Sequence, residues 1–316
     1  MIAKSIARLT GYASALPTPF RYGQVDEEAF ETLCSWQITE GVSGLVVCGT
    51  TGEAPTLSPA EQQLLVRRAV AIARGRVPVI AGAGSNATTH AIDLARAAQG
   101  EGADGLLVVV PYYNRPSQEG LYRHFRAIHD AVDIPVLLYD VPSRTGCGLA
   151  DDTVVRLAAL PRVAGLKDAT GDLARPGRLR ARLGTAFRLL TGEDANALGF
   201  FARGGDGCIS VVSNVAPRLC VDLHAAWRSG DFEKAEALSL SVVALSRALF
   251  LESHPVPVKH ALALMGLMSA AVRLPLCEAG EATRREIAAC LRSPAIRGLP
   301  DAVRWRDMKA NLAPVA

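Results

Sequence analysis

The segment Val-Ala-Gly-Leu-Lys-Asp-Ala-Thr, residues 163–170, is a short apolar run that ends in a lysine and then in turn-forming residues. Such a run is typical of a strand buried on both faces. Burial disfavours the charged form of Lys167 and leaves an amine that can attack a carbonyl and form a Schiff base. The other interpretation is a structural lysine with a buried stem and a head group in solvent. The octapeptide alone favours that second interpretation.

Similar short apolar runs recur on both sides of this segment, each followed by a loop and an amphipathic stretch. The sequence predicts eight strands, at residues 13–16, 44–48, 78–81, 105–110, 135–139, 163–166, 187–190 and 208–211. Apolar strands that alternate with helices indicate a parallel sheet covered on both faces. Eight such units are the number in a closed (β/α)₈ barrel, the TIM barrel. An open doubly wound sheet is the alternative.

Helices are expected between the strands, at residues 26–39, 58–73, 87–99 and 118–131 among others. Ser58 and Glu61 have the spacing of a capping box, and Pro59 between them suits the first position of a helix. The sequence therefore predicts that a helix begins at this point.

The alternation of strand and helix stops near Pro217. We expect a barrel core over residues 1–216 and a helical region over residues 217–316 that packs on the barrel. The longest apolar run, residues 261–272, is too short to span a bilayer and is expected to form a buried helix. Residues beyond about 295, Trp305 among them, carry no pattern that we can interpret.

Composition describes a folded protein with an ample core, because 49% of the 316 residues are hydrophobic and 21% are charged. A net charge of +3 argues neither for nucleic acid nor for an anionic membrane. The seven cysteines form no C-x-x-C pair and the six histidines no H-x-x-x-H, so no metal site is expected. Without an apolar stretch at the N-terminus long enough for a signal peptide, we expect a cytoplasmic protein with reduced thiols.

Polar residues gather where the predicted strands end, which is where (β/α)₈ enzymes carry their active sites. In chain order these residues are Thr50, Thr51, Tyr112, Tyr113, Tyr139, Arg144, Lys167 and Gly192. Valine and leucine side chains are enough to fill a barrel interior, so packing alone does not require a buried lysine and several hydroxyl groups there. This setting changes the balance in favour of a catalytic Lys167.

Four segments carry a resemblance to a known family: Gly-Thr-Thr-Gly-Glu (49–53), Pro-Tyr-Tyr-Asn-Arg-Pro (111–116), Tyr-Asp-Val-Pro-Ser-Arg-Thr-Gly (139–146) and Gly-Leu-Lys-Asp-Ala-Thr-Gly (165–171). With them the chain resembles the dihydrodipicolinate synthases, also called 4-hydroxy-tetrahydrodipicolinate synthases. These belong to the pyruvate-dependent class I aldolases, with N-acetylneuraminate lyase. The resemblance runs from about residue 10 to about residue 295, through Pro-Val-Pro-Val-Lys (255–259).

The resemblance implies a lyase that condenses pyruvate with L-aspartate 4-semialdehyde in diaminopimelate and lysine biosynthesis, without a metal or organic cofactor. It implies that Lys167 forms the Schiff base with pyruvate and that Tyr139 is the general acid and base. Thr50 and Tyr113 would relay protons, and Tyr113 would reach in from a neighbouring subunit. The resemblance therefore also implies a homo-oligomer, a tetramer built as a dimer of dimers.

Substrate contacts follow from the resemblance in the same way. Thr51 would hold the pyruvate carboxylate, and Arg144 would grip the carboxylate of the semialdehyde with its guanidinium. Gly192 and the carbonyl of Ile209 would border the pocket. A loop arginine in a surface ion pair is the other interpretation of Arg144, and its place in Pro-Ser-Arg-Thr-Gly argues against it.

Three other functions stay open at this point. One is a Schiff-base lyase of the same superfamily that takes a different aldehyde or oxo-acid. Another is an inactive barrel that binds pyruvate-like ligands as a sensor. The third is an NAD-dependent oxidoreductase, from Gly82-Ala-Gly84-Ser-Asn-Ala87 with Asp104 some twenty residues on. That match is weak, because it follows the third strand and Asp104 precedes a strand.

One departure from the family pattern concerns regulation. Synthases that are inhibited by lysine have histidines where this chain has Pro59 and Gln62, and a glutamate where it has His90; Asn86 and Tyr112 are kept. Loss of that carboxylate removes a contact to the lysine ammonium. We therefore predict weak or absent feedback by lysine.

Overall fold

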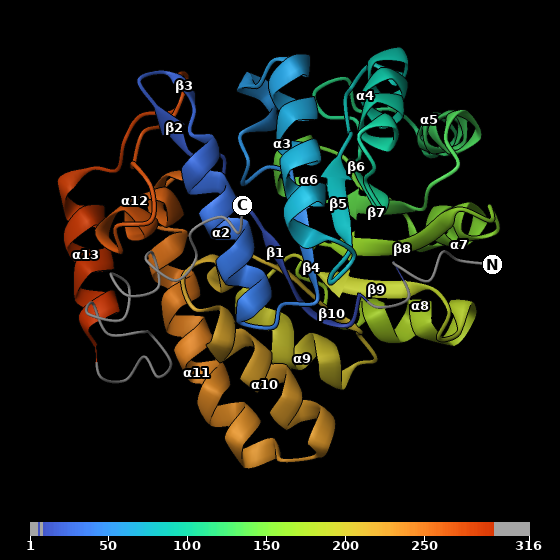
Figure 1. The fold of residues 1–316 in the computed structure, drawn as a ribbon. Coiled ribbons are helices and arrows are strands. Elements are labelled where there is room, and N and C mark those ends of the chain that lie inside the picture. Colours follow the sequence, from blue (N-terminus) through green and yellow to red (C-terminus); the bar gives the residue numbers. More distant parts are fainter. Residues whose placement is uncertain (1–5, 7–8, 294–316) are drawn as a thin grey trace.

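The computed structural model describes residue 6 and residues 9–293, and its centre is a closed barrel of eight parallel strands (Figure 1). Around the barrel the strands are β1 (Gly11–Ala15), β4 (Gly44–Val47), β5 (Val79–Gly82), β6 (Gly105–Val109), β7 (Val136–Asp140), β8 (Val163–Asp168), β9 (Arg188–Thr191) and β10 (Gly207–Ser210). β1 pairs with both β4 and β10, which closes the barrel and excludes the open sheet. All eight predicted strands are confirmed.

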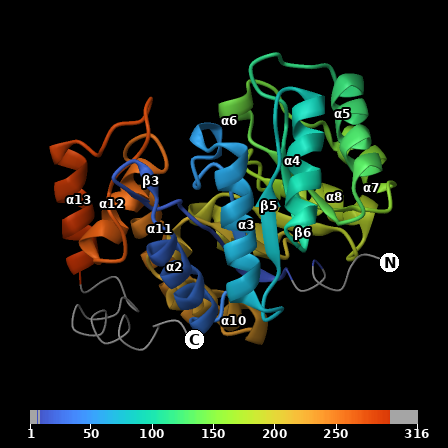
Figure 2. The same ribbon diagram turned by 45° about the horizontal axis from the view of Figure 1, so that its top comes forward.

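Helices wrap the outside of the barrel (Figure 2). They are α2 (Glu27–Thr39), α3 (Pro59–Ala73), α4 (Thr88–Gly100), α5 (Gln118–Ala131), α7 (Asp151–Ala158), α8 (Arg175–Leu183) and α9 (Ala197–Ala202), with the short α6 (Pro142–Thr145) in the loop after β7. The capping box of α3 is confirmed, since Ser58 Oγ accepts from Glu61 N at 3.3 Å and Glu61 Oε2 accepts from Ser58 N at 2.8 Å.

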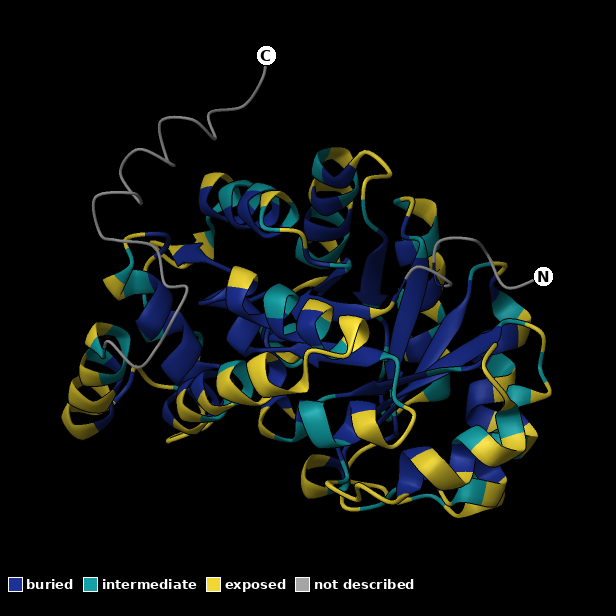
Figure 3. Cartoon of the chain, turned by 90° about the horizontal axis from the view of Figure 1, so that it is seen from below, coloured by how far each residue is buried: buried dark blue, intermediate teal, exposed yellow. Residues whose placement is uncertain are grey.

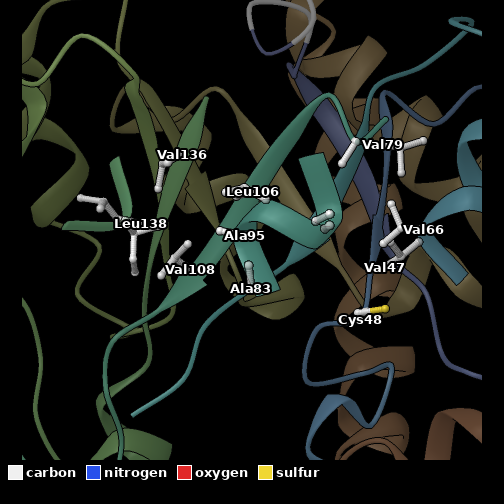
Figure 4. Close-up of a cluster of buried hydrophobic side chains, with 14 of the residues drawn as sticks. Val47, Cys48, Val66, Val79, Ala83, Ala95, Leu106, Val108, Val136 and Leu138 are labelled. Carbon is white, nitrogen blue, oxygen red and sulfur yellow. The ribbon is translucent and has the colours of Figure 1, made fainter. Parts of the chain in front are cut away.

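Most apolar side chains of the barrel strands belong to one of two clusters. Val46, Ile80, Leu107 and Leu137 belong to the cluster in the barrel interior. The neighbouring positions face the helices, and Figure 4 shows some of them, such as Val47 and Leu106, with Val66 of α3 and Ala95 of α4. Because successive side chains of a strand point to opposite sides, both faces of the sheet are apolar. Figure 3 shows the strands as the buried centre and the helices exposed on their outer faces.

The C-terminal helices gather on one side of the barrel, next to α2 (Figure 1). They are α10 (Pro217–Ser229), α11 (Phe232–Leu249), α12 (Val256–Leu264) and α13 (Glu281–Arg292). Trp36 of α2, Leu219 of α10, Leu245 of α11 and Leu262 of α12 share one apolar cluster with Tyr12 of β1. The division into residues 1–216 and 217–316 stays a prediction; α10 begins at Pro217, and among the described residues no strand follows it.

Two local features differ from what the sequence predicts. The run 261–272 does not form one helix, because α12 ends at Leu264 and Gly266 follows in a left-handed conformation, with φ of +72°. That conformation suits glycine and stops a helix. A small hairpin of β2 (Phe20–Arg21) and β3 (Gln24–Val25) was not expected. Strands of two residues are too short to show an alternating pattern.

A fully buried ion pair connects the C-terminal helices to the turn after β4. Lys259 Nζ in α12 lies 2.5 Å from Glu53 Oε1, and the two side chains are 0% and 1% exposed. Glu53 Oε2 also accepts from the backbone N–H of Arg273 at 3.0 Å, and the Lys259 ammonium lies 4.2 Å from the centre of the Phe20 ring. Burial lowers the pKa of Lys259 to about 8, against the opposing effect of the Glu53 charge.

Replacement of Lys259 by methionine tests this connection. The variant leaves the Glu53 carboxylate buried without its cation, so we expect a loss of about 3–5 kcal/mol in the free energy of unfolding, measured by urea denaturation. Arg218→Met is the matched control, because its pair with Asp222 is exposed and is expected to contribute less than about 1 kcal/mol. Equal stability losses in the two variants would contradict the expectation.

Candidate active site

Lys167 and Tyr139 lie side by side at the carboxyl ends of β8 and β7. The two residues are paired in the parallel ladder, and Lys167 Nζ lies 4.2 Å from the centre of the Tyr139 ring. Each side chain is only 7% exposed. Within the described residues no carboxylate forms an ion pair with the Lys167 ammonium. This geometry does not fit a lysine whose head group reaches solvent, and it leaves the amine available for chemistry.

Gly192, which follows β9, provides the space that the Lys167 side chain occupies. A Cβ atom at this position would lie 2.8 Å from Lys167 Cε and 3.1 Å from the Cβ of Ala169. The backbone N–H of Gly192 donates to the carbonyl of Asp168 at 2.7 Å, which fixes the approach of the two strand ends. Ile209 of β10 is fully buried and belongs to the interior cluster that also contains Tyr139.

The turn after β4 brings Thr50 and Thr51 to the same end of the barrel. Cys48 and Glu53, at its two ends, both have φ of +54°, a conformation that non-glycine residues rarely adopt. Gly82 of β5 allows the turn to approach, because a Cβ atom there would lie 2.0 Å from the carbonyl oxygen of Cys48. Thr51 is 3% exposed, and its hydroxyl lies 2.9 Å from His254 Nε2.

His254 is a neighbour of the site that the sequence did not reveal. It lies between α11 and α12 and is 6% exposed. Burial, followed by the positive charges of Arg144 and Lys167, lowers its pKa to about 3. A single histidine before a Pro-Val-Pro segment gave no signal of this position, because the contact to Thr51 spans 203 residues of sequence.

Two predicted residues lie at the rim and are exposed in the single chain. Arg144 belongs to α6, directly after β7. Tyr113, in the loop after β6, is 89% exposed and has φ of +72°. The described chain therefore places Lys167 against Tyr139 and Gly192 and buries Thr51, whereas Arg144 and Tyr113 are exposed.

A buried charge cluster lies directly behind the two central residues. Asp140 and Asp168, which follow Tyr139 and Lys167, flank the guanidinium of Arg175 in α8; Nη1 is 2.7 Å from Asp140 Oδ2 and 3.5 Å from Asp168 Oδ2. Arg175 Nε also pairs with Asp151 Oδ1 at 2.9 Å. Successive strand residues face opposite sides, so Asp140 and Asp168 point out of the barrel when Tyr139 and Lys167 point into it. The cluster therefore connects the ends of β7 and β8 to α8 on the outer side of the barrel. The available sequence signal was an aspartate directly after each of Tyr139 and Lys167.

The glycines of the dinucleotide-like segment have roles within the barrel itself. Besides the contact of Gly82 with the turn, a Cβ atom at Gly84 would lie 2.6 Å from the backbone nitrogen of Val109. Asp104 accepts a hydrogen bond from the backbone N–H of Val79 at 2.9 Å. Close packing accounts for these residues without a nucleotide.

The described residues contain neither a metal-binding cluster nor a membrane-spanning helix. They hold no group of three or more His, Cys, Asp or Glu side chains arranged to bind a metal. None of their helices has both the length and the apolar character needed to cross a membrane.

A closed (β/α)₈ barrel with a buried lysine beside a tyrosine at the carboxyl ends of its strands defines a class, the (β/α)₈ barrel enzymes, whose active sites lie at that end of the barrel. The model of the dihydrodipicolinate synthetase family matches residues 8–293. The chain belongs to this family, and it is an enzyme of the 4-hydroxy-tetrahydrodipicolinate synthase type, as the resemblance implied.

Individual relatives agree with this assignment. The chain is 50% identical over 284 residues to the 4-hydroxy-tetrahydrodipicolinate synthase of Bradyrhizobium diazoefficiens, which covers 90% of this chain and 95% of the relative. It is 51% identical over 286 residues to that of Phenylobacterium zucineum, with 90% and 97% covered. The dihydrodipicolinate synthase of Aquifex aeolicus has a TM-score of 0.89 at 39% identity, covering 93% of this chain and all of that one. The Acinetobacter baumannii enzyme, solved with pyruvate, has a TM-score of 0.87 at 42% identity, with 90% and 98% covered.

Proposed function

We propose that this chain condenses pyruvate with L-aspartate 4-semialdehyde through a Schiff base on Lys167, in the diaminopimelate route to lysine. The observation that carries the proposal is the buried Lys167 amine against the Tyr139 ring, without a carboxylate partner among the described residues. Relatives at about 50% identity, with 4-hydroxy-tetrahydrodipicolinate synthase as their activity, support it.

Each proposed step uses a side chain of the site. The Lys167 amine attacks the keto carbon of pyruvate, and loss of water gives a protonated imine. Tyr139 takes a proton from the pyruvate methyl group, and the electron pair moves into the imine to give an enamine. The enamine carbon attacks the aldehyde carbon of the semialdehyde, and the resulting alkoxide takes a proton. Thr50 and Tyr113 relay protons between Tyr139 and solvent.

The two substrate carboxylates are assigned to different parts of the rim. Thr51 and the backbone of its turn hold the pyruvate carboxylate, with Gly192 and the Ile209 carbonyl at the border of the pocket. Arg144 lies at the mouth, where a guanidinium can bind a second carboxylate with two parallel hydrogen bonds. In the alternative function the second substrate is a different oxo-acid or aldehyde. That substrate would have to carry an anionic group for Arg144 to bind.

We also propose that the chain acts in the cytoplasm as a homo-oligomer, a tetramer built as a dimer of dimers. The support is Tyr113, which is 89% exposed although its backbone is held at φ of +72°. A non-glycine residue in this conformation costs free energy and is kept where a function requires it. A neighbouring subunit that receives the Tyr113 phenol provides that function.

Weak or absent feedback by lysine remains a prediction. The three residues on which it is based line one cavity in the structure. Pro59 and Gln62 of α3 and His90 of α4 surround a space of about 220 Å³ next to Cys48. Gln62 Nε2 donates to the carbonyl of Ala54 at 3.2 Å, so its side chain is already engaged. Asp93 is the one carboxylate among the lining residues. A relative from Cyanidioschyzon merolae, 35% identical, has been solved with lysine bound.

The proposed reaction is tested by a condensation assay with pyruvate and L-aspartate 4-semialdehyde, followed through a coupled reductase. We expect turnover in the range of about 1–10³ per second and its loss in Lys167→Ala, because no other group in the site can form the imine. Turnover with another aldehyde but none with the semialdehyde would move the assignment to the alternative function.

The role of Tyr113 in a second subunit is tested by mixing two variants. Lys167→Ala and Tyr113→Phe are each expected to be nearly inactive. If Tyr113 acts across subunits, oligomers reassembled from both variants contain sites with an intact Lys167 and an intact Tyr113, and part of the activity returns. Oligomers of either variant alone are the control, and no recovery in the mixture would contradict the proposal.

The feedback prediction is tested by titrating lysine into the same assay. We expect half-inhibition only above about 1 mM, which corresponds to a binding free energy weaker than about −4 kcal/mol. Asp93→Asn is the control for the remaining carboxylate and should leave the curve unchanged. Half-inhibition well below about 1 mM would show the prediction to be wrong, and its loss in Asp93→Asn would identify the compensating contact.

A further inference from the structure

The His254 imidazole is held in a fixed orientation beside the turn that carries Thr51. Its ring stacks on Phe250 with a centroid distance of 5.1 Å and an interplanar angle of 16°. Its Nε2 atom lies 2.9 Å from Thr51 Oγ1, and the residue is 6% exposed. These contacts leave the ring little freedom, so the hydrogen bond to Thr51 has a defined geometry.

The imidazole is neutral in this environment. Burial and the charges of Arg144 and Lys167 lower its pKa to about 3, so it carries no proton in excess at any pH near neutrality. A neutral imidazole has one N–H donor and one acceptor nitrogen. Its second nitrogen, Nδ1, is buried and has no hydrogen-bond partner among the described residues. The position of the single proton therefore decides what the Thr51 hydroxyl can do.

Two tautomers are possible, and they have opposite consequences. If Nε2 accepted the Thr51 proton, the hydroxyl would have no proton left for a substrate, and Nδ1 would be a buried donor without an acceptor. If Nε2 carries the proton and donates it to Thr51 Oγ1, the hydroxyl proton stays free to point into the site. The second arrangement leaves only a lone pair unsatisfied at Nδ1 and avoids an orphaned donor.

We propose that His254 is a positioning residue of the active site, whose neutral imidazole donates Nε2–H to Thr51 Oγ1 and so directs the hydroxyl proton toward the carboxylate of the α-keto acid. The inference rests on the proposed function, since it concerns how that site recognises its first substrate. It assigns to the C-terminal helical region a part in substrate binding. Because the imidazole is neutral, it orients the hydroxyl without adding a third positive charge beside Lys167 and Arg144.

The proposal is tested by trapping pyruvate on Lys167 with borohydride at a series of pyruvate concentrations. The fraction of chains that carry the reduced adduct is measured by mass spectrometry and gives the half-saturating concentration without the second substrate. His254→Phe keeps the stacking on Phe250 and removes the hydrogen bond. We expect the half-saturating concentration to rise about tenfold, the loss typical of a hydrogen bond to a charged acceptor.

Further variants separate positioning from a structural role. His254→Gln presents an amide nitrogen near the position of Nε2 and should recover most of the affinity, whereas His254→Asn reaches only the position of Nδ1 and should not. The double variant Thr51→Val with His254→Phe should bind pyruvate no more weakly than Thr51→Val alone. His254 is proposed to act only through the Thr51 hydroxyl, so its loss has no further effect once that hydroxyl is gone. His260→Phe, in the following helix α12, is the control for loss of a histidine.

The outcomes divide cleanly. A tenfold shift in His254→Phe with rescue by glutamine supports the proposal. An unchanged half-saturating concentration, even with a lower melting temperature, overturns it and leaves His254 a packing residue. Rescue by asparagine but not glutamine also overturns it, because the active nitrogen would then not face Thr51. Absence of any adduct in the unaltered chain would instead overturn the proposed function, and the inference with it.

Discussion

The arrangement of the site depends on one fully buried ion pair, Glu53 with Lys259. Two charges in an apolar interior are stable only as a pair, so the turn after β4 and helix α12 must meet at one fixed point. Glu53 ends the turn in a left-handed conformation, and the hydroxyl-bearing residues Thr50 and Thr51 precede it by three and two residues. His254 lies five residues before Lys259. The same pair therefore fixes both partners of the Thr51–His254 hydrogen bond.

A second constraint acts on the opposite side of the site. The alternation of side chains along β7 and β8 sends Tyr139 and Lys167 toward the interior while Asp140 and Asp168 meet Arg175 outside it. Burial raises the pKa of Asp140 although Arg175 opposes that shift, so the cluster is held in a dry environment. Asp168, the residue next to Lys167, and Asp140, the residue next to Tyr139, are thus committed to a guanidinium behind the sheet and are not ion-pair partners of the Lys167 amine.

The sequence predicted the barrel because its signal is local and repeated. Each strand is a short apolar run at the start of a strand-helix unit, and all eight runs formed strands. The positions of Lys167, Tyr139, Thr51 and Gly192 followed from the same pattern, since strand ends share one rim. What the sequence missed depends on contacts between distant segments. His254 meets Thr51, and Arg175 meets Asp140, only after the chain has closed. The helix expected over residues 261–272 does not form. Although the twelve residues are largely apolar, Gly266 has a left-handed backbone conformation and α12 ends before it.

The link between α12 and the turn after β4 also bears on the order in which the chain acquires its activity during synthesis. The N-terminal part of a chain is synthesised first, and all eight strands of the barrel precede Pro217. Lys259 is made more than forty residues later, so a nascent chain that has reached Pro217 has all its strands while Glu53 still lacks its cation. The pocket of such a chain is incomplete although its sheet is finished. The site around the reactive amine is therefore complete only after α12 has been synthesised and has docked on the turn after β4.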